Sequence, residues 1–334
     1  MVFKNAQLYN VSELDETENG FEMLRIPREY EEKLSEKGRQ KNRFSSGCEI
    51  RFVCLDDRGV KVKLHTCDTE FAFVYVYYGC IGAGWQECRK IITDDPDCTI
   101  TVTSPPHPEI YGEISKDSGF TFSPRVVRLI LPNTRCIISD VYGKCRPPEK
   151  EEVPGIRYLA YGSSITHGSL SLIQMNSYAS RTAENLKADL INLGFAGSAC
   201  LEKEMADYIA GRGDWDFATL EMGVNVIGMP FDEFKNRVEY LIKTVSDTGK
   251  KVFCIDLFYL YAEPNSQKES FIKGYRSIVK ETVEKHNCDN LIYLNGEKLL
   301  SIGSAGLSGD LTHPNIRGCE CIAENLTDEI RKYL

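Results

Sequence analysis

The stretch LAYGSSITHG, residues 159–168, decides how the second half of the chain folds. Its apolar start is typical of a buried strand, and Gly162 ends that strand in a turn with two serines, Ser163 and Ser164. A serine on a tight strand-to-helix turn can be exposed where a substrate carbonyl reaches it. The free N–H groups of the following helix would then favour a developing negative charge. The simpler interpretation is that the serines and Thr166 only cap the helix.

The same pattern, an apolar run followed by a small or polar turn, repeats through the second half of the chain. The strand candidates are IRYLAY (156–161), ADLINLG (188–194), DFATLEM (216–222), KVFCIDLF (251–258) and NLIYLN (290–295). Helical patterns lie between them, and one apolar stripe at spacings of three and four consists of Phe231, Phe234, Val238, Leu241 and Val245. Alternating strands and helices predict a parallel sheet that is covered by helices on both faces.

The first half of the chain is predicted to be all-β. VKVKLHT (60–66) alternates apolar and polar residues with a period of two. Further strand candidates are CEIRFVCL (48–55), EFAFVYVYY (70–78), CTITVTS (98–104) and RVVRLILP (125–132). Short strands at this spacing indicate a β-sandwich of the jelly-roll type. The segment EYEEKLSEK (29–37) is either a short helix or a charged loop. RPPEKEEVPG (146–155) has the composition of a linker, so we expect a β-domain over 1–148 and an α/β domain over 154–334.

The composition excludes several classes of function. The 334 residues carry a net charge of −9 without a dense Lys/Arg cluster, so we expect no nucleic-acid partner. No stretch approaches the roughly 20 apolar residues of a membrane span, and MVFKNAQLYN lacks an apolar signal core. The 13 cysteines form no C-x-x-C pair, so we expect no metal site. We interpret them as reduced thiols of a cytoplasmic protein.

A serine hydroxyl is a weak nucleophile and needs a base, and the chain offers five histidines. His167 is too close in sequence to Ser164 to aim its ring easily at the hydroxyl, although it could line a pocket. His313 lies in SGDLTHPNIRG (308–318), a loop between the last strand and the last helix, three residues after Asp310. That spacing can place the carboxylate beside the imidazole and fix its tautomer. The alternative is that Asp310 caps the helix and His313 is incidental.

Acyl transfer also needs hydrogen-bond donors aimed at the oxyanion. NLGFAGSACLE (192–202) places Gly197 in a small-residue turn, where its N–H could approach a ligand. EMGVNV (221–226) places Asn225 two residues after a glycine. A side-chain amide at a strand end is either an oxyanion donor or a turn former.

In this order, the four segments resemble the SGNH-hydrolase (GDSL-type esterase/lipase) superfamily, in the branch with an added N-terminal β-sandwich. The resemblance covers residues 156–334. It implies a three-layer α/β/α sandwich with five parallel strands in the flavodoxin-like order 2-1-3-4-5. It also implies Ser164 as nucleophile, His313 as base, Asp310 as its orienter, and the Ser164 N–H, Gly197 N–H and Asn225 amide as the oxyanion hole.

Two positions depart from the pattern of that superfamily. Ser163 stands where G-D-S members carry an aspartate, which removes a carboxylate next to the nucleophile. Val226 stands where G-x-N-D members carry an aspartate that is not part of the triad, so we expect only the loop's hydrogen bonds to change.

The resemblance implies a serine esterase that needs no metal or cofactor. No long apolar lid segment flanks the predicted site, so we expect a short, acetyl-like acyl group on a carbohydrate or other small alcohol, cleaved through an acyl-enzyme on Ser164. Two alternatives stay open: a lysophospholipase or thioesterase with the same triad, and a non-catalytic carbohydrate-binding protein. We expect an acylated sugar or similar small ester as the partner and no membrane partner, while an oligomer stays open.

Overall fold

The computed structural model describes all 334 residues except the side chain of Cys88. The chain divides into two compact units: unit 1 contains Met1–Arg28, Asn42–Gly155 and Lys187–Asp189, and unit 2 contains Glu29–Lys41, Ile156–Leu186 and Leu190–Leu334.

The segment 29–37, which the sequence places with the N-terminal domain, belongs to unit 2. It contributes to the short helices α1 (Arg28–Glu31) and α2 (Glu36–Asn42). The Tyr30 ring lies 5.4 Å from the Tyr208 ring. The Ser35 N–H donates to the Glu202 carboxylate over 2.9 Å. These are long-range contacts that local composition does not encode.

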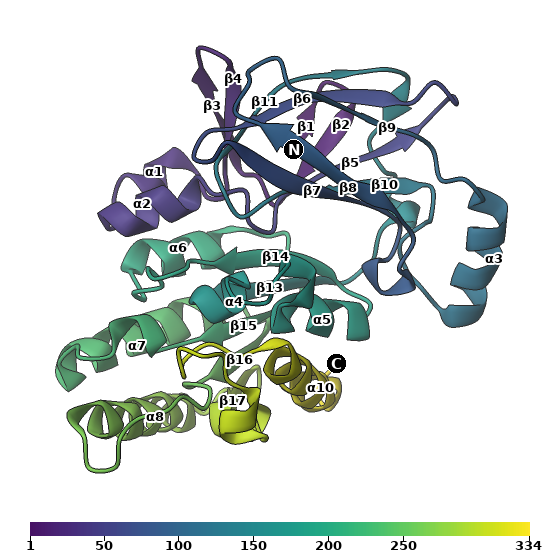
Figure 1. Cartoon of the computed structure of the whole chain (residues 1–334). Helices are drawn as coiled ribbons and strands as arrows, with labels where there is room; N and C mark the ends of the chain where they lie inside the picture. The colour runs from purple at the N-terminus through teal and green to yellow at the C-terminus, as the bar shows by residue number, and fades with distance from the viewer. The chain divides into compact units, whose positions relative to one another are not determined.

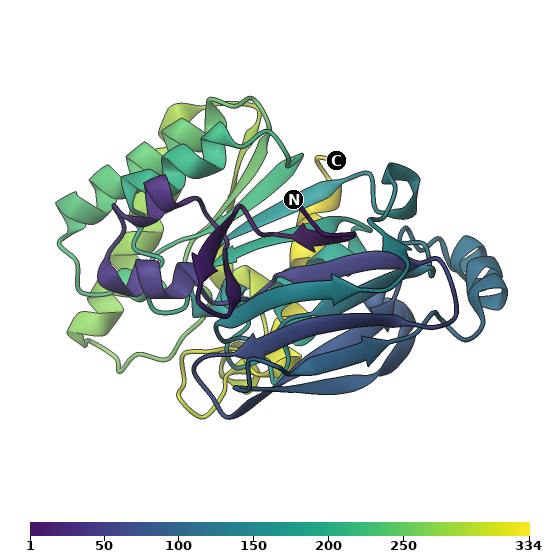
Figure 2. The same cartoon turned by 90° about the horizontal axis from the view of Figure 1, so that it is seen from above.

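Unit 1 contains two antiparallel sheets (Figures 1 and 2). One has the order β1-β2-β5-β10-β7-β8, with β12 also paired to β5: β1 (Val2–Phe3), β2 (Ala6–Tyr9), β5 (Glu49–Cys54), β10 (Val126–Ile130), β7 (Phe71–Tyr78), β8 (Gln86–Thr93) and β12 (Cys145–Arg146). The other has the order β3-β4-β11-β6-β9: β3 (Glu13–Thr17), β4 (Gly20–Leu24), β11 (Cys136–Tyr142), β6 (Val60–Thr66) and β9 (Thr99–Val102). The sequence prediction of a two-sheet β-unit is confirmed.

The alternation in β6 shows why this unit folds as a sandwich. Val60, Val62 and Leu64 are buried and Lys61 is exposed, so every second side chain faces the core. One core cluster joins residues of both sheets, such as Ile50 of β5 and Leu64 of β6. The sequence did not predict β1–β4, β8, β11 or the helix α3 (Pro108–Ser118).

Unit 2 contains the predicted five-stranded sheet in the order β14-β13-β15-β16-β17, which is 2-1-3-4-5 along the chain. The strands are β13 (Arg157–Gly162), β14 (Asp189–Gly194), β15 (Phe217–Glu221), β16 (Lys251–Ile255) and β17 (Leu291–Leu294). The pairs β13–β15, β15–β16 and β16–β17 are parallel. This parallel sheet confirms the predicted fold class.

Helices cover both faces of this sheet (Figure 1). On one side lie α6 (Lys203–Gly211), α7 (Phe231–Ser246) and α8 (Gln267–His286), and on the other α5 (Tyr178–Asn185) and α10 (Ile316–Arg331). The short helices α4 (Ser164–His167) and α9 (Gly296–Leu299) follow β13 and β17.

The predicted apolar stripe of α7 packs on the sheet side except at its first residue. Phe234, Val238, Leu241 and Val245 are buried, whereas Phe231 is 41% exposed. Phe231 instead contacts Phe271 of α8, with 5.3 Å between the ring centroids. Over the described residues, every helix is too short or too polar to cross a bilayer.

Candidate active site

The turn between β13 and α4 holds Ser164 at the start of a helix. Ser163 is the N-cap of α4, and its hydroxyl accepts a backbone N–H from that helix over 3.1 Å. The turn is tight at Gly162, where a Cβ atom would lie 2.3 Å from Thr166 Oγ1 and 2.5 Å from Glu221 Oε2. Only glycine fits such an approach. Helix capping is therefore the function of Ser163, and Ser164 is left for another role.

The structure brings Ser164, His313 and Asp310 into one hydrogen-bonded chain. Ser164 Oγ lies 2.6 Å from His313 Nε2, and His313 Nδ1 lies 2.5 Å from Asp310 Oδ2. Ser164 and His313 are 149 positions apart in the sequence. Ser164 is only 9% exposed. The arrangement is that of a nucleophile, a base and an orienting carboxylate.

The electrostatics of Asp310 favour its charged form. Partial burial acts to raise the pKa of this carboxyl, but hydrogen bonds from the His313 backbone N–H, the imidazole and the Thr312 N–H outweigh it and hold the pKa below its usual value. Both backbone N–H groups reach Oδ1 over 3.0 Å. Asp310 is therefore an anion at neutral pH, which suits the stabilisation of an imidazolium.

The histidine loop is built without using Asp310 as a helix cap. The cap of α10 is Asn315, whose Oδ1 accepts the Gly318 N–H over 2.9 Å. Leu311 has a φ of +57°, and its carbonyl accepts the Tyr261 N–H over 2.9 Å. Because Asn315 caps α10, the interpretation of Asp310 as the cap of that helix is excluded.

Gly197 and Asn225 lie in the loops that follow β14 and β15, the two strands on either side of β13. Parallel neighbours end at the same edge of a sheet, so both loops lie at the edge that carries Ser164. The Asn225 Oδ1 accepts the Ala199 N–H over 3.1 Å, which orients the amide and ties the two loops together. Gly197 is exposed with a φ of +69°, and a Cβ there would meet nothing within 4 Å. Their role as oxyanion donors stays a prediction.

His167 does not line the edge of the site. It is 1% exposed, and its Nδ1 lies 3.1 Å from the Gly194 carbonyl oxygen. Asn192, which the sequence analysis did not single out, fixes the same contact: its Nδ2 donates to the Thr166 carbonyl over 2.9 Å and its Oδ1 accepts the Gly194 N–H over 2.8 Å. A polar residue inside the apolar strand ADLINLG was the signal for it.

The loop after β15 is held from α8. The Tyr275 hydroxyl donates to the Val226 carbonyl over 2.6 Å and lies 2.8 Å from the Met229 carbonyl. Val226 itself is buried. The Tyr275 phenol of α8 therefore orders the loop in which Val226 stands at the position of the G-x-N-D aspartate.

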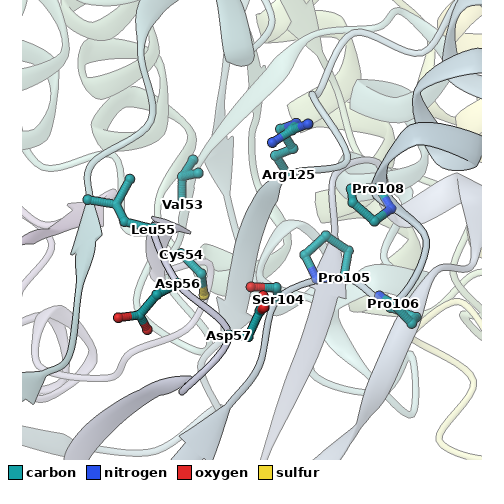
Figure 3. A pocket seen from close by; sticks show the side chains of 10 residues that line it. All are labelled: Val53, Cys54, Leu55, Asp56, Asp57, Ser104, Pro105, Pro106, Pro108 and Arg125. Atoms are coloured by element: carbon teal, nitrogen blue, oxygen red, sulfur yellow. The ribbon is translucent and has the colours of Figure 1, made fainter.

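A separate pocket of about 350 Å³ lies in unit 1 (Figure 3). It is lined by backbone and side chains of 53–57, Ser104, three prolines and Arg125. Asp56 is paired with Arg58, and Arg125 with Glu109. None of the predicted site residues lines it. Among the described residues, no group of three or more His, Cys, Asp or Glu is arranged to hold a metal ion.

A serine hydrogen-bonded to a histidine–aspartate pair, at the carboxyl edge of a five-stranded parallel sheet, defines the class of serine hydrolases. Residues 160–320 match the GDSL-like Lipase/Acylhydrolase family. The C-terminal half of the chain therefore belongs to the GDSL/SGNH hydrolase family, and the protein is a carboxylic ester hydrolase. No curated protein matches the sequence.

Three solved structures share the fold of the chain across both units. The salicylyl-acyltransferase SsfX3 from a tetracycline biosynthetic pathway is 19% identical, with a TM-score of 0.79 over 98% of this chain and 94% of that chain. A protein from Bacteroides ovatus described as a GDSL-like lipase is 18% identical, with a TM-score of 0.66 over 98% and 97%. A Corynascus carbohydrate esterase family 2 enzyme is 12% identical, with a TM-score of 0.55 over 86% and 94%. At these identities the likeness concerns the fold.

Proposed function

We propose that the protein hydrolyses a short-chain, acetyl-like ester of a carbohydrate or other small alcohol through an acyl-enzyme on Ser164. The observation that carries this proposal is the 2.6 Å contact between Ser164 Oγ and His313 Nε2, continued to Asp310. It supplies a nucleophile with its base already in reach.

In the first step, Ser164 Oγ attacks the ester carbonyl while His313 Nε2 takes the hydroxyl proton. The Ser164 N–H, the Gly197 N–H and the Asn225 Nδ2 stabilise the oxyanion. When the ester C–O bond breaks, His313 returns the proton to the leaving alcohol, and Asp310 stabilises the imidazolium in between. Water then attacks the acyl-enzyme by the same route, which releases the acid and regenerates Ser164.

The loops around this edge support a short acyl group. Residues 195–202 and 222–230, which follow β14 and β15, contain no helix longer than the 3-10 turn Val224–Val226 in the described chain. Such loops give little apolar surface to cover a long chain. The name of the structural relative from Corynascus, a carbohydrate esterase, agrees with a sugar as the alcohol.

One observation favours a second candidate, a lysophospholipase or thioesterase with the same triad. Leu311, between Asp310 and His313, is 45% exposed. An exposed leucine beside a site can bind the apolar part of a longer acyl chain.

Two measurements test the proposal. A serine-reactive fluorophosphonate should label the protein, and Ser164→Ala should abolish the label. A series of p-nitrophenyl esters should then give the highest kcat/KM between acetate and butyrate. A maximum at octanoate or longer would replace the short-acyl proposal by the second candidate, and labelling that persists in Ser164→Ala would disprove Ser164 as nucleophile.

A further inference from the structure

Glu221, the last residue of β15, contacts the turn of residues 162–166 that holds Ser164, called here the nucleophile turn. It is 1% exposed, and its Oε2 accepts the backbone N–H of Ser163 over 2.6 Å and the hydroxyl of Thr166 over 3.1 Å. The two donors flank Ser164 on either side in the chain. One carboxylate oxygen therefore fixes the backbone just before the nucleophile and the side chain two residues after it.

The surroundings of Glu221 are arranged to receive a carboxylate. Gly162 has room for no Cβ because Glu221 Oε2 would lie 2.5 Å from it. The Tyr178 hydroxyl lies 2.7 Å from Thr166 Oγ1. With the Thr166 proton directed to Glu221, the tyrosine donates to Thr166, so a chain of donors ends on the carboxylate. Position 163, where related motifs carry an aspartate, is a serine in this chain.

This carboxylate is retained against an electrostatic cost. Burial raises the pKa of Glu221 above its usual value, although the hydrogen bonds from Ser163 and Thr166 act to lower it. Its Oε1 is buried and accepts no hydrogen bond from the described residues. A buried charge that hydrogen bonds satisfy only in part opposes folding, so its presence points to a role in activity.

We propose that Glu221 is a positioning residue: its carboxylate holds the Ser163 N–H and the Thr166 hydroxyl, so that Ser164 Oγ, which lies between them in the chain, meets His313. This rests on the proposed function. Glu221 thereby supplies, from the neighbouring strand, the carboxylate that position 163 lacks.

The test compares two variants of Glu221 with a matched buried carboxylate. Glu221→Gln keeps the shape and removes the charge, and Glu221→Asp keeps the charge but withdraws it from the turn. The control is Asp256→Asn: Asp256 follows β16, is fully buried, and accepts the Gly296 N–H over 2.6 Å and the Tyr293 hydroxyl over 2.7 Å.

We expect Glu221→Asp to lower kcat by about 10²-fold with little change in KM, because the shorter side chain withdraws the acceptor from both donors and misplaces the nucleophile, not the substrate. Glu221→Gln should lower kcat by about tenfold, because its amide oxygen can still accept both hydrogen bonds but holds them less strongly than a carboxylate does. Asp256→Asn should leave kcat unchanged.

Thermal unfolding separates this role from a structural one. The pKa of Glu221 is higher in the fold than in the unfolded chain, so folding stability falls as pH rises through that range, and removing the charge should not lower the melting temperature at pH 8. Wild-type kcat in Glu221→Asp would overturn the proposal, and so would a Glu221→Gln protein that loses as much kcat as Glu221→Asp does. If Glu221→Asp does not fold, an unchanged kcat in Glu221→Gln would overturn it as well. Ser164→Ala tests the proposed function by itself, because it removes the nucleophile and leaves Glu221 intact.

Discussion

The nucleophile turn and the histidine loop meet at one hydrogen bond but are held in different ways. The turn is buried: Thr166 is 0% exposed and is packed against Glu221. The loop is open to solvent: the Asp310 side chain is 41% exposed. Burial raises the pKa of Glu221, whereas in Asp310 hydrogen bonds overcome burial and lower it. Close packing and hydrogen bonds to a buried carboxylate therefore fix the serine, whereas solvent-exposed hydrogen bonds fix the histidine. Substitutions in the turn should affect folding and activity together, and those in the loop mainly activity.

The loop gives the largest expected effect. His313→Ala should lower kcat by about 10⁴-fold or more, because Ser164 loses its base. The melting temperature should stay close to that of the wild type, since among the described residues the His313 ring is hydrogen-bonded to Ser164 and Asp310. Hydrolysis of p-nitrophenyl acetate and thermal unfolding check the two parts. A loss of tenfold or less would show that His313 is not the base.

Asn225→Ala should lower kcat by about 10²–10³-fold with KM nearly unchanged, as expected when one oxyanion donor is lost. Asn225→Ala removes the hydrogen bond from the Ala199 N–H, but Tyr275 still binds the Val226 carbonyl and should keep the Asn225 loop on α8. Asn185→Ala serves as a control: its Nδ2 donates to Thr327 on α10. Equal kcat values in the two variants would remove Asn225 from the oxyanion hole.

The sequence predicted the parts of the fold that depend on local pattern. Apolar runs with turns gave the five parallel strands of unit 2, and alternation gave β6 of unit 1. The sequence around helix α3 had two usable local signals, a proline at its start and Gly119 at its end. In the structure Gly119 has a φ of +64°. The strand β8, QECRKIIT, has no clear alternation of apolar and polar residues, so its own sequence does not predict a strand. Its antiparallel pairing with β7 fixes it in the sheet.

The site was predictable from its motif residues but not from its supports. Ser164, Asp310 and His313 belong to short, ordered segments, whereas Glu221 is a single charge inside the apolar run DFATLEM. That charge was the available signal, because a glutamate is rarely buried without a partner. Its partners, the Ser163 N–H and the Thr166 hydroxyl, come from another strand end, so only the fold identifies them.

Gly194→Ala tests the buried side of the comparison. A Cβ there would lie 2.2 Å from the His167 backbone nitrogen and 2.4 Å from its Cα, so α4 must shift. We expect a loss of about 1–3 kcal/mol in the free energy of unfolding, together with a fall in kcat of about tenfold or more. Gly213→Ala is the control, because a Cβ there meets nothing within 4 Å. A stable Gly194→Ala protein with full activity would show that the turn is not fixed by packing.

Tyr275→Phe should give the smallest effect, and it sharpens the comparison because the loop after β15 is held both by packing and by hydrogen bonds. The buried Tyr275 hydroxyl of α8 bonds the Val226 and Met229 carbonyls of this loop. Removing that hydroxyl leaves the Val226 carbonyl without this donor, which should lower the free energy of unfolding by about 1–3 kcal/mol. Asn225 lies next to Val226, so kcat should fall by less than in Asn225→Ala, while KM stays constant. Urea unfolding and kcat check this against Tyr240→Phe, which removes an exposed hydroxyl bonded to Asp207. A loss of stability with unchanged kcat would mean that the Tyr275 hydroxyl does not place Asn225.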